Sequence, residues 1–104
     1  MTEITLGRTG IKVPPLYFGS LTMSPCQYDF EAERAGEVIA YAAEKGLNFI
    51  DTAQYYRNYH LLRAAVKKSK KDLIITSKTY AYEYQAAVEA VEEARREIDR
   101  DYID

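Results

Sequence analysis

Apolar and polar residues follow two different spacings along this chain, and the two spacings alternate. Apolar side chains recur every three to four residues, as they do in amphipathic helices, in segments 30–45, 58–68 and 83–100. Short apolar runs precede these segments, at 16–19, 47–51 and 73–78. Runs without polar alternation are typical of strands covered on both faces of a parallel sheet. The pattern therefore predicts three βα units and an α/β fold with right-handed crossovers.

The first residues predict a β-hairpin ahead of these units. Two short extended pieces within residues 2–13 flank the turn-rich sequence Gly7-Arg8-Thr9-Gly10. Two prolines follow directly, and proline cannot donate a hydrogen bond to a neighbouring strand. At the other end of the chain, residues 101–104 have the composition with which a further strand would begin.

Residues that favour helix ends indicate the boundaries of the first helix. Asp29 suits the N-cap position, and Gly46 after Lys45 is a C-terminal stop signal. In the third helix, five apolar residues share one face, which we expect to be the buried one: Ala87, Val88, Val91, Ala94 and Ile98.

Composition then limits the classes of function. The chain has 104 residues, of which 47% are hydrophobic and 29% charged, so it suits a single globular domain over 1–104. A net charge of −2 argues against nucleic-acid binding, and no apolar stretch approaches the ~20 residues of a membrane span. The one cysteine, Cys26, excludes an internal disulfide and has no identifiable partner for nucleophilic chemistry. We expect a cytoplasmic protein that binds neither nucleic acid nor membranes.

The ends of the predicted strands carry the candidate chemistry. Ligands of parallel α/β folds bind at the carboxyl ends of the strands. The first strand ends at Gly19-Ser20, the second at Asp51 with Tyr55-Tyr56 soon after it, and the third at Lys78. An acid, a base and tyrosines therefore converge on one edge of the sheet.

Four segments resemble motifs of the aldo-keto reductase family. These are Leu6-Gly7-Arg8-Thr9-Gly10-Ile11-Lys12-Val13, Asn48-Phe49-Ile50-Asp51-Thr52-Ala53-Gln54-Tyr55-Tyr56, Ile75-Thr76-Ser77-Lys78 and Arg100-Asp101-Tyr102-Ile103-Asp104. They occur in the family's order and together cover nearly the whole chain. The sequence is also similar to a bacterial branch of the family that adds ferredoxin-type cysteine motifs near its C-terminus, a region absent here.

The resemblance implies a fold and a site. The family's TIM (β/α)₈ barrel typically needs about 250 residues, so we expect a partial barrel made of the N-terminal hairpin and about three βα units. By motif, Asp51, Tyr56 and Lys78 match the catalytic Asp, Tyr and Lys. The catalytic His would follow Asp104 and is not present. The resemblance also implies NADPH as cofactor, with Gly19, Ser20 and Asp51 as contacts, although most of the phosphate pocket belongs to later strands.

These residue types suit the reduction of a small aldehyde or ketone. A tyrosine side chain has a pKa near 10, too high for an effective acid at neutral pH. A lysine ammonium nearby lowers such a pKa by stabilising the phenolate, and a carboxylate keeps that ammonium charged and oriented. Tyr56 would then protonate the carbonyl oxygen while NADPH supplies the hydride.

Each residue also has a plainer interpretation. Taken singly, Asp51 would be a helix cap, Tyr56 a packing residue and Lys78 a solvated lysine. Their joint position at strand ends within the motifs favours the functional interpretation. The family usually has glycine after the tyrosine, followed closely by glutamate, whereas this chain has Arg57-Asn58-Tyr59-His60. That departure makes the family a weaker guide to the start of the second helix and to the substrate rim. His60 lies in the wrong segment to replace the missing histidine.

Two functional hypotheses remain. The first is an aldo-keto reductase lineage, in which this truncated chain alone is expected to be inactive because it lacks the histidine and most of the cofactor pocket. The alternative is a non-catalytic α/β module that self-associates through two exposed sheet edges and an uncovered face. Three alternating tyrosines would line a substrate pocket or cover apolar surface in a homo-oligomer: Tyr80, Tyr82 and Tyr84.

Overall fold

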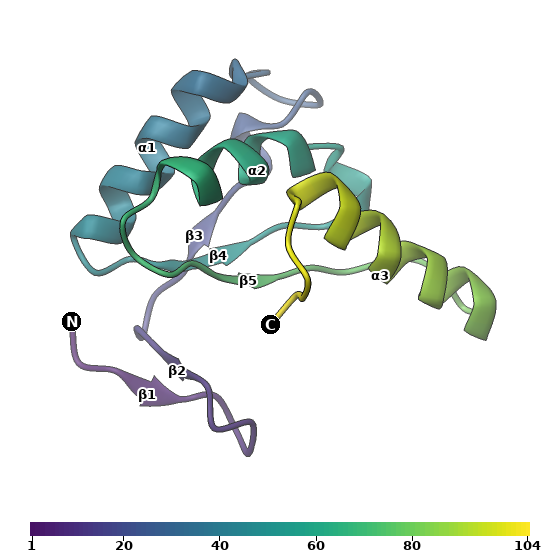
Figure 1. The fold of residues 1–104 in the computed structure, drawn as a ribbon, viewed down its shortest axis with the longest axis horizontal. Helices are drawn as coiled ribbons and strands as arrows, with labels where there is room; N and C mark the ends of the chain where they lie inside the picture. Colours follow the sequence, from purple (N-terminus) through teal and green to yellow (C-terminus); the bar gives the residue numbers. More distant parts are fainter.

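The computed structural model describes residues 1–104 and contains two separate sheets (Figure 1). Strands β1 (Ile4–Thr5) and β2 (Lys12–Val13) pair as the expected antiparallel hairpin. Strands β3 (Phe18–Gly19), β4 (Phe49–Asp51) and β5 (Ile74–Thr76) form a parallel sheet in that order. Helices α1 (Ala32–Glu44), α2 (Tyr59–Lys68) and α3 (Tyr84–Ile98) each follow one of these strands. The hairpin and three βα units of the sequence prediction are therefore confirmed.

The two faces of the parallel sheet have different surroundings. Helices α1 and α2 lie over one face of the sheet, and the hairpin of β1 and β2 lies on the other side (Figure 1). Ile50 and Ile75 are register partners on the helix-covered face, and neither has any exposed surface. Their neighbours Phe49 and Ile74 alternate to the opposite face, where they stay partly exposed and outside the hydrophobic core.

Helices α1 and α2 approach each other closely because α1 carries a glycine at their contact. A Cβ atom added at Gly36 would lie 3.1 Å from the backbone carbonyl carbon of Ala64 in α2. This is closer than ordinary van der Waals contact, so the missing side chain lets the two backbones come together. Leu61 and Leu62 of α2 and Ile39 of α1 are fully buried in the core beneath this contact.

The two ends of α1 follow the sequence prediction differently. Gly46 adopts a φ of 97° just after the helix, as expected for a glycine stop signal. The expected N-cap is wrong, because Glu31 and not Asp29 occupies that position. The loop turns at Asp29, which has a φ of 48° and donates its backbone N–H to Ser24 O. The turn delays the start of the helix to Ala32.

Helix α3 is buried only in its C-terminal half. Ala90, Ala94 and Ile98 are buried, but Val88 and Val91 are 37% and 51% exposed, so the expected buried face is wrong at these two valines. The N-terminal half of α3 extends beyond α2 and the sheet, where nothing covers it (Figure 1). The helix then ends at Ile98, earlier than expected, because the next residue adopts a left-handed conformation.

The C-terminal residues lie against β5 without forming the expected strand. Asp104 donates its N–H to Ile75 O over 3.1 Å, and its carboxylate Oδ2 accepts the Ile75 N–H over 2.9 Å. The same carboxylate oxygen lies 3.5 Å from Arg100 Nη2. β5 is therefore an edge strand of the sheet whose outer backbone groups are engaged at Ile75. β3 has no strand on its outer side.

None of the three helices is both long enough and apolar enough to cross a lipid bilayer.

Candidate active site

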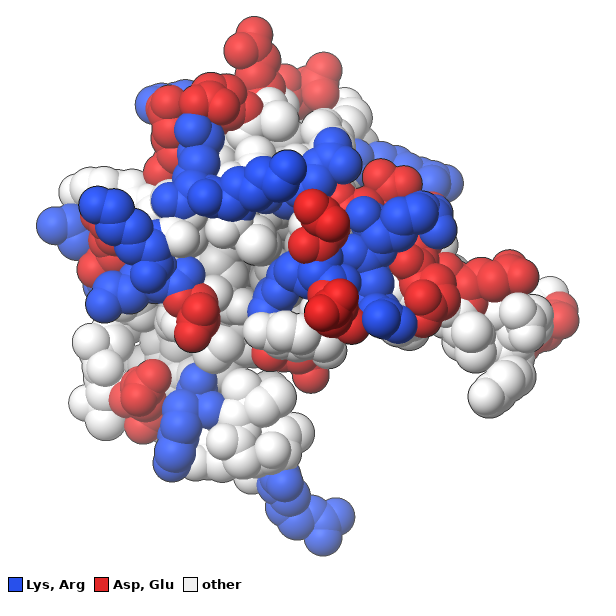
Figure 2. Space-filling view, in the orientation of Figure 1, with Lys and Arg blue, Asp and Glu red and all other residues white.

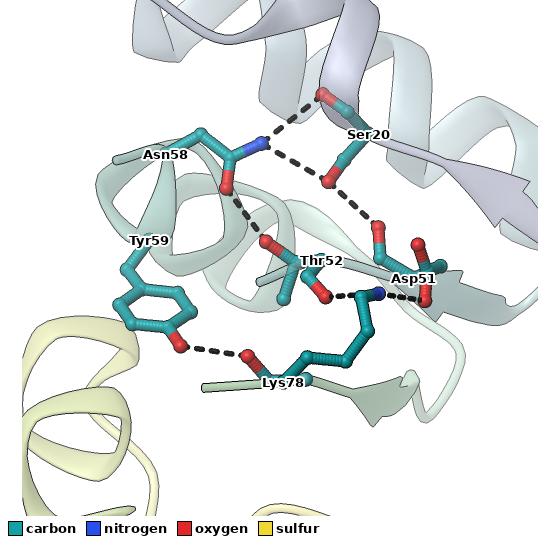
Figure 3. Close-up of polar contacts among 7 residues, drawn as sticks. Ser20, Asp51, Thr52, Asn58, Tyr59 and Lys78 are labelled. Atoms are coloured by element: carbon teal, nitrogen blue, oxygen red, sulfur yellow. Dashed lines mark hydrogen bonds and ion pairs between the residues drawn. The ribbon is translucent and has the colours of Figure 1, made fainter. Parts of the chain in front are cut away.

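The carboxyl ends of β4 and β5 bring an acid and a base together. Asp51 is the last residue of β4, and Lys78 follows β5 by two residues. Because the strands are parallel neighbours, their ends meet at one edge, and Lys78 Nζ lies 2.6 Å from Asp51 Oδ1 (Figure 3). The ammonium also donates to Thr52 O over 2.8 Å. The contact expected between Asp51 and Lys78 is present.

Tyr56 completes the cluster from a short helical turn between β4 and α2. The turn is the 3₁₀ helix η2 (Gln54–Tyr56), and Lys78 Nζ lies 5.3 Å from the centre of the Tyr56 ring. Gln54 fixes this turn from three directions. Its backbone N–H donates to Lys78 O, its Nε2 donates to Glu93 Oε2 of α3, and its Oε1 accepts from Thr79 Oγ1. The turn that carries the tyrosine is thereby tied to the segment that carries the lysine.

The surroundings of Lys78 favour its charged form. Partial burial alone would lower the pKa of Lys78, since desolvation disfavours an ammonium. The hydrogen bond and the negative charge of Asp51 outweigh that effect. Tyr56 also raises the pKa of Lys78, although the two side chains do not form a hydrogen bond. The pKa of Lys78 is therefore raised above its usual value, and the site holds a positive charge beside the Tyr56 ring.

A buried polar network supports this edge of the sheet from behind. Three of its side chains, those of Ser20, Thr52 and Asn58, have no exposed surface. Ser20 Oγ donates to Asp51 O over 2.7 Å, and Thr52 Oγ1 donates to Asn58 Oδ1 over 2.6 Å. Asn58 Nδ2 then donates to both the carbonyl and the hydroxyl oxygen of Ser20 over 3.0 Å (Figure 3). The network joins the ends of β3 and β4 to the start of α2.

The sequence analysis did not identify Asn58 as a site residue, although its position before a helix could have drawn attention to it. Asparagine before an apolar helical pattern is a common N-cap, and Asn58 does occupy the N-cap of α2. Its side chain makes no capping bond, however, and turns inward to Ser20 and Thr52. The departure at Arg57 does not displace the helix, because Arg57 adopts the left-handed conformation, with φ 56°, that glycine would adopt there.

The three residues expected to contact the cofactor differ from one another in exposure. Gly19 is exposed, and no atom lies within 4 Å of a Cβ built on it, so the space beside the end of β3 is open. Asp51 is one-fifth exposed and shares its carboxylate with Lys78. Ser20 is fully buried, with its hydroxyl engaged by Asp51 O and Asn58. Cofactor contacts by these three residues stay predictions.

Tyr59, another residue that the sequence did not indicate, lies on the helix side of the cluster. It is the first residue of α2 and is buried, and its hydroxyl lies 2.6 Å from Ser77 Oγ (Figure 3). Burial raises the pKa of Tyr59 most, and the charge of Glu93 raises it further, against the Ser77 hydrogen bond and the Lys78 charge. Tyr59 therefore keeps its proton to a higher pH than a free tyrosine does. The Tyr56 ring, by contrast, faces the charged Lys78.

The three alternating tyrosines after Lys78 are strongly exposed. Tyr80, Tyr82 and Tyr84 expose 83%, 94% and 85% of their surface. Tyr80 contacts the ring of Tyr55 edge to face, with the ring centres 5.7 Å apart. Cys26 and His60, for which the sequence suggested no catalytic role, are both exposed on the surface. Whether the tyrosines line a pocket or an interface stays a prediction.

Several known structures share the fold of this chain. Over the whole chain, it superimposes on a thermostable aldo-keto reductase solved with the inhibitor epalrestat, with a TM-score of 0.84 and 30% identity. An aldo-keto reductase from Pseudomonas aeruginosa matches 98% of the chain with a TM-score of 0.83 and 24% identity. One from Bombyx mori, in complex with NADP, matches 99% with a TM-score of 0.77 and 20% identity. These matches cover 41%, 43% and 36% of the respective relatives.

The chain thus spans about two-fifths of the length of the structures that it matches, and its sheet is an open part of their barrel. The fold expected from the sequence, a partial barrel of α/β class, is confirmed. A comparison with curated proteins gave no significant match. The profile of the Aldo/keto reductase family matches residues 15–104, which include all three βα units. The chain belongs to the aldo/keto reductase family, whose members are generally NADP-dependent oxidoreductases.

Proposed function

We propose that this chain carries the proton-donating part of an active site that reduces aldehydes or ketones with NADPH. The observation that carries the proposal is the position of Lys78 Nζ, which lies 2.6 Å from Asp51 Oδ1 and 5.3 Å from the centre of the Tyr56 ring. The three groups stand at the carboxyl edge of a parallel sheet, where α/β folds bind their ligands.

In this proposal each side chain has one task. The Tyr56 hydroxyl donates a proton to the carbonyl oxygen of the substrate as negative charge develops there. The Lys78 ammonium stabilises the phenolate that remains, because an opposite charge close by favours the ionised form. Asp51 and Thr52 O orient the ammonium through two short hydrogen bonds. The buried network around Asn58 keeps the strand ends in register while the proton moves.

The residues present fit the nicotinamide end of the cofactor. NADPH, when bound, supplies the hydride that adds to the carbonyl carbon. The space beside Gly19, where a built Cβ would meet no atom within 4 Å, supports this placement, since Gly19 is the register partner of Asp51. Gly19 and Asp51 are therefore the residues that we propose to contact the ring. Ser20 would hold the Asp51 backbone from behind, through the hydrogen bond from its hydroxyl.

The proposal can be tested in a chimera. Residues 1–104 would replace the matching part of the thermostable relative, which is 30% identical to this chain. We expect a folded chimera to oxidise NADPH in the presence of a reactive aldehyde. Tyr56→Phe should lower kcat by about a hundredfold or more, as expected for loss of a general acid. The matched variant is Tyr55→Phe, whose hydroxyl lies on an exposed neighbouring ring and should leave kcat close to the parent value.

Two outcomes would contradict the proposal. One is a folded chimera that binds NADPH and shows no turnover. The other is a chimera in which Tyr56→Phe and Tyr55→Phe are equally active. The 104-residue chain alone is expected to show no turnover above the buffer blank, since it supplies three of the four expected catalytic residues and only a small part of the expected cofactor pocket.

A further inference from the structure

The side-chain amide of Gln54 is held at both of its ends. Its Nε2 donates to Glu93 Oε2 of α3 over 2.8 Å, and its Oε1 accepts from Thr79 Oγ1 over 2.6 Å. A carboxylate can only accept, and the Thr79 hydroxyl oxygen already accepts the Ala81 N–H, so the hydroxyl proton is directed to Gln54. The two partners therefore fix which way round the amide lies, with its nitrogen toward α3 and its oxygen toward the segment after Lys78.

The turn that Gln54 begins has little else to hold it in place. The 3₁₀ helix η2 is three residues long, contains no buried residue and has no side-chain cap at Ala53. Its own backbone bonds run from Tyr56 N–H to Ala53 O over 3.1 Å and from Arg57 N–H to Gln54 O over 3.3 Å. Short 3₁₀ segments have poorer hydrogen-bond geometry than α-helices. The orientation of this turn therefore depends on bonds to other elements.

Gln54 supplies three such bonds, and each reaches a different residue. Its backbone N–H donates to Lys78 O over 2.9 Å, and a single bond of this kind would let the turn rotate about one contact. The amide adds a second contact at Thr79 and a third at Glu93, which oppose that rotation. The ring of Tyr56, two residues later in the turn, is thereby held with its centre 5.3 Å from Lys78 Nζ.

Glu93 differs from the other acidic residues of its half of α3. Charged side chains of both signs are intermixed over the C-terminal part of this helix (Figure 2). Two of its carboxylates form ion pairs with arginines of the same helix: Glu92 with Arg95 over 2.8 Å, and Glu97 with Arg96 over 3.7 Å. Glu93 accepts the Gln54 amide instead. Because a charged acceptor forms a stronger hydrogen bond than a neutral one, Glu93 is a firm attachment point on the half of α3 that packs against the core.

We propose that Gln54 is a positioning residue for the proton transfer, and that its amide, held by Glu93 and Thr79, keeps the Tyr56 ring against the Lys78 ammonium. The catalytic part of this proposal rests on the proposed function, whereas the position of the ring is a property of the chain itself. Without the amide contacts the turn stays attached to β5's following segment by one backbone bond, and the ring moves away from the lysine. A displacement of about 1 Å at a reacting group can cost about a hundredfold in rate.

Solution NMR of the 104-residue chain tests the position of the ring. We expect nuclear Overhauser contacts between the Tyr56 ring protons and the Lys78 side chain in the parent, and their loss in Gln54→Leu. The matched control is Gln85→Leu, because Gln85 is exposed on α3 and bonds to Glu89 of the same helix over 3.4 Å. This control should keep the ring contacts of the parent. Circular dichroism checks that both variants fold, and Thr79→Val, which removes only the donor to the amide oxygen, replaces Gln54→Leu if that variant does not fold.

The chimera described above tests the consequence for catalysis. Gln54→Leu should lower kcat by about tenfold or more and leave the KM for NADPH unchanged, as expected when only the transition state loses an interaction. Glu93→Gln keeps an oxygen acceptor for the amide, so it should retain both the ring contacts and kcat. Glu93→Ala offers no acceptor and should lose part of both. Rescue by the conservative variant separates positioning from a general loss of structure.

Three results would overturn the proposal. The first is a folded parent chain without contacts between Tyr56 and Lys78. The second is a folded Gln54→Leu chain that keeps these contacts. The third is a chimera whose activity depends on Tyr56 and in which Gln54→Leu and Gln85→Leu have the same kcat. If Gln54→Leu loses the ring contacts and the chimera does not depend on Tyr56, the positioning role is supported and the proposed proton donor is wrong.

Discussion

Helices α1 and α2 bury their apolar stripes along most of their length, whereas α3 buries only its C-terminal half. Ile39, Leu61 and Leu62 of the first pair have no exposed surface, but Val91 of α3 is half exposed. All three helices have the same amphipathic spacing in the sequence. The difference therefore comes from the partner and not from the helix: α1 and α2 meet over the sheet, while α3 extends past its last strand. An apolar stripe shows which face of a helix can be buried. The neighbouring helices and strands determine how much of that face is buried.

The largest expected effect contrasts these two regions directly. Leu62→Ala should lower the free energy of unfolding by about 2–5 kcal/mol, since it leaves a cavity in the fully packed core between α1, α2 and the sheet. Val91→Ala should change it by about 0.5 kcal/mol or less, because the valine is half exposed. Urea unfolding followed by circular dichroism measures both. A similar loss in the two variants would mean that the N-terminal half of α3 is covered in solution.

A smaller effect is expected where α2 meets the site. Asn58→Ala should lower the free energy of unfolding by about 1–3 kcal/mol, because the fully buried side chains of Thr52 and Ser20 lose their partner. The matched control is Asn48→Ala, which removes an exposed hydrogen bond from Nδ2 to Asp72 O and should cost less. Equal costs for the two asparagines, in the same urea titration, would show that burial of the network adds nothing.

The sequence predicted the elements better than their details. Periodicity located the three α-helices and the strands β3, β4 and β5, but not the 3₁₀ turns. The parallel order of β4 and β5 was enough to bring Asp51 and Lys78 into contact. The direction of the Asn58 side chain could not be predicted, since it depends on where Ser20 lies in a strand distant along the chain. The error at Asp29 has a similar origin: its loop is shaped by backbone bonds to residues that follow β3, which no local preference reveals.

The smallest expected effect is on stability at alkaline pH, and it concerns a tyrosine and a lysine at the two ends of α2 and the lysine that follows β5. The pKa values of Tyr59 and Lys78 are raised in the folded chain, as is that of Lys68, which pairs with Glu33. Above about pH 10 the unfolded chain loses these protons before the folded chain does, so stability is full below that pH and falls as the pH rises further.

Urea midpoints at neutral pH, pH 10 and pH 11 check this direction. In Tyr59→Phe, which cannot ionise, the fall above pH 10 should be shallower than in the parent. A parent chain whose stability increases above pH 10 would contradict the sign of all three shifts.

The contact of Asp104 with Ile75 has a consequence for how such a chain can aggregate. Growth of a filament by strand addition requires two free attachment points on every molecule, one for the preceding copy and one for the next. At Ile75 both the donor and the acceptor that β5 would offer to a newcomer are already satisfied by Asp104. β3 keeps a free outer edge, and β1 and β2 of the hairpin each have one unpaired side as well. A newcomer that pairs with β5 must first displace Asp104 from Ile75, so strand addition is expected at β3 or at the hairpin before it occurs at β5.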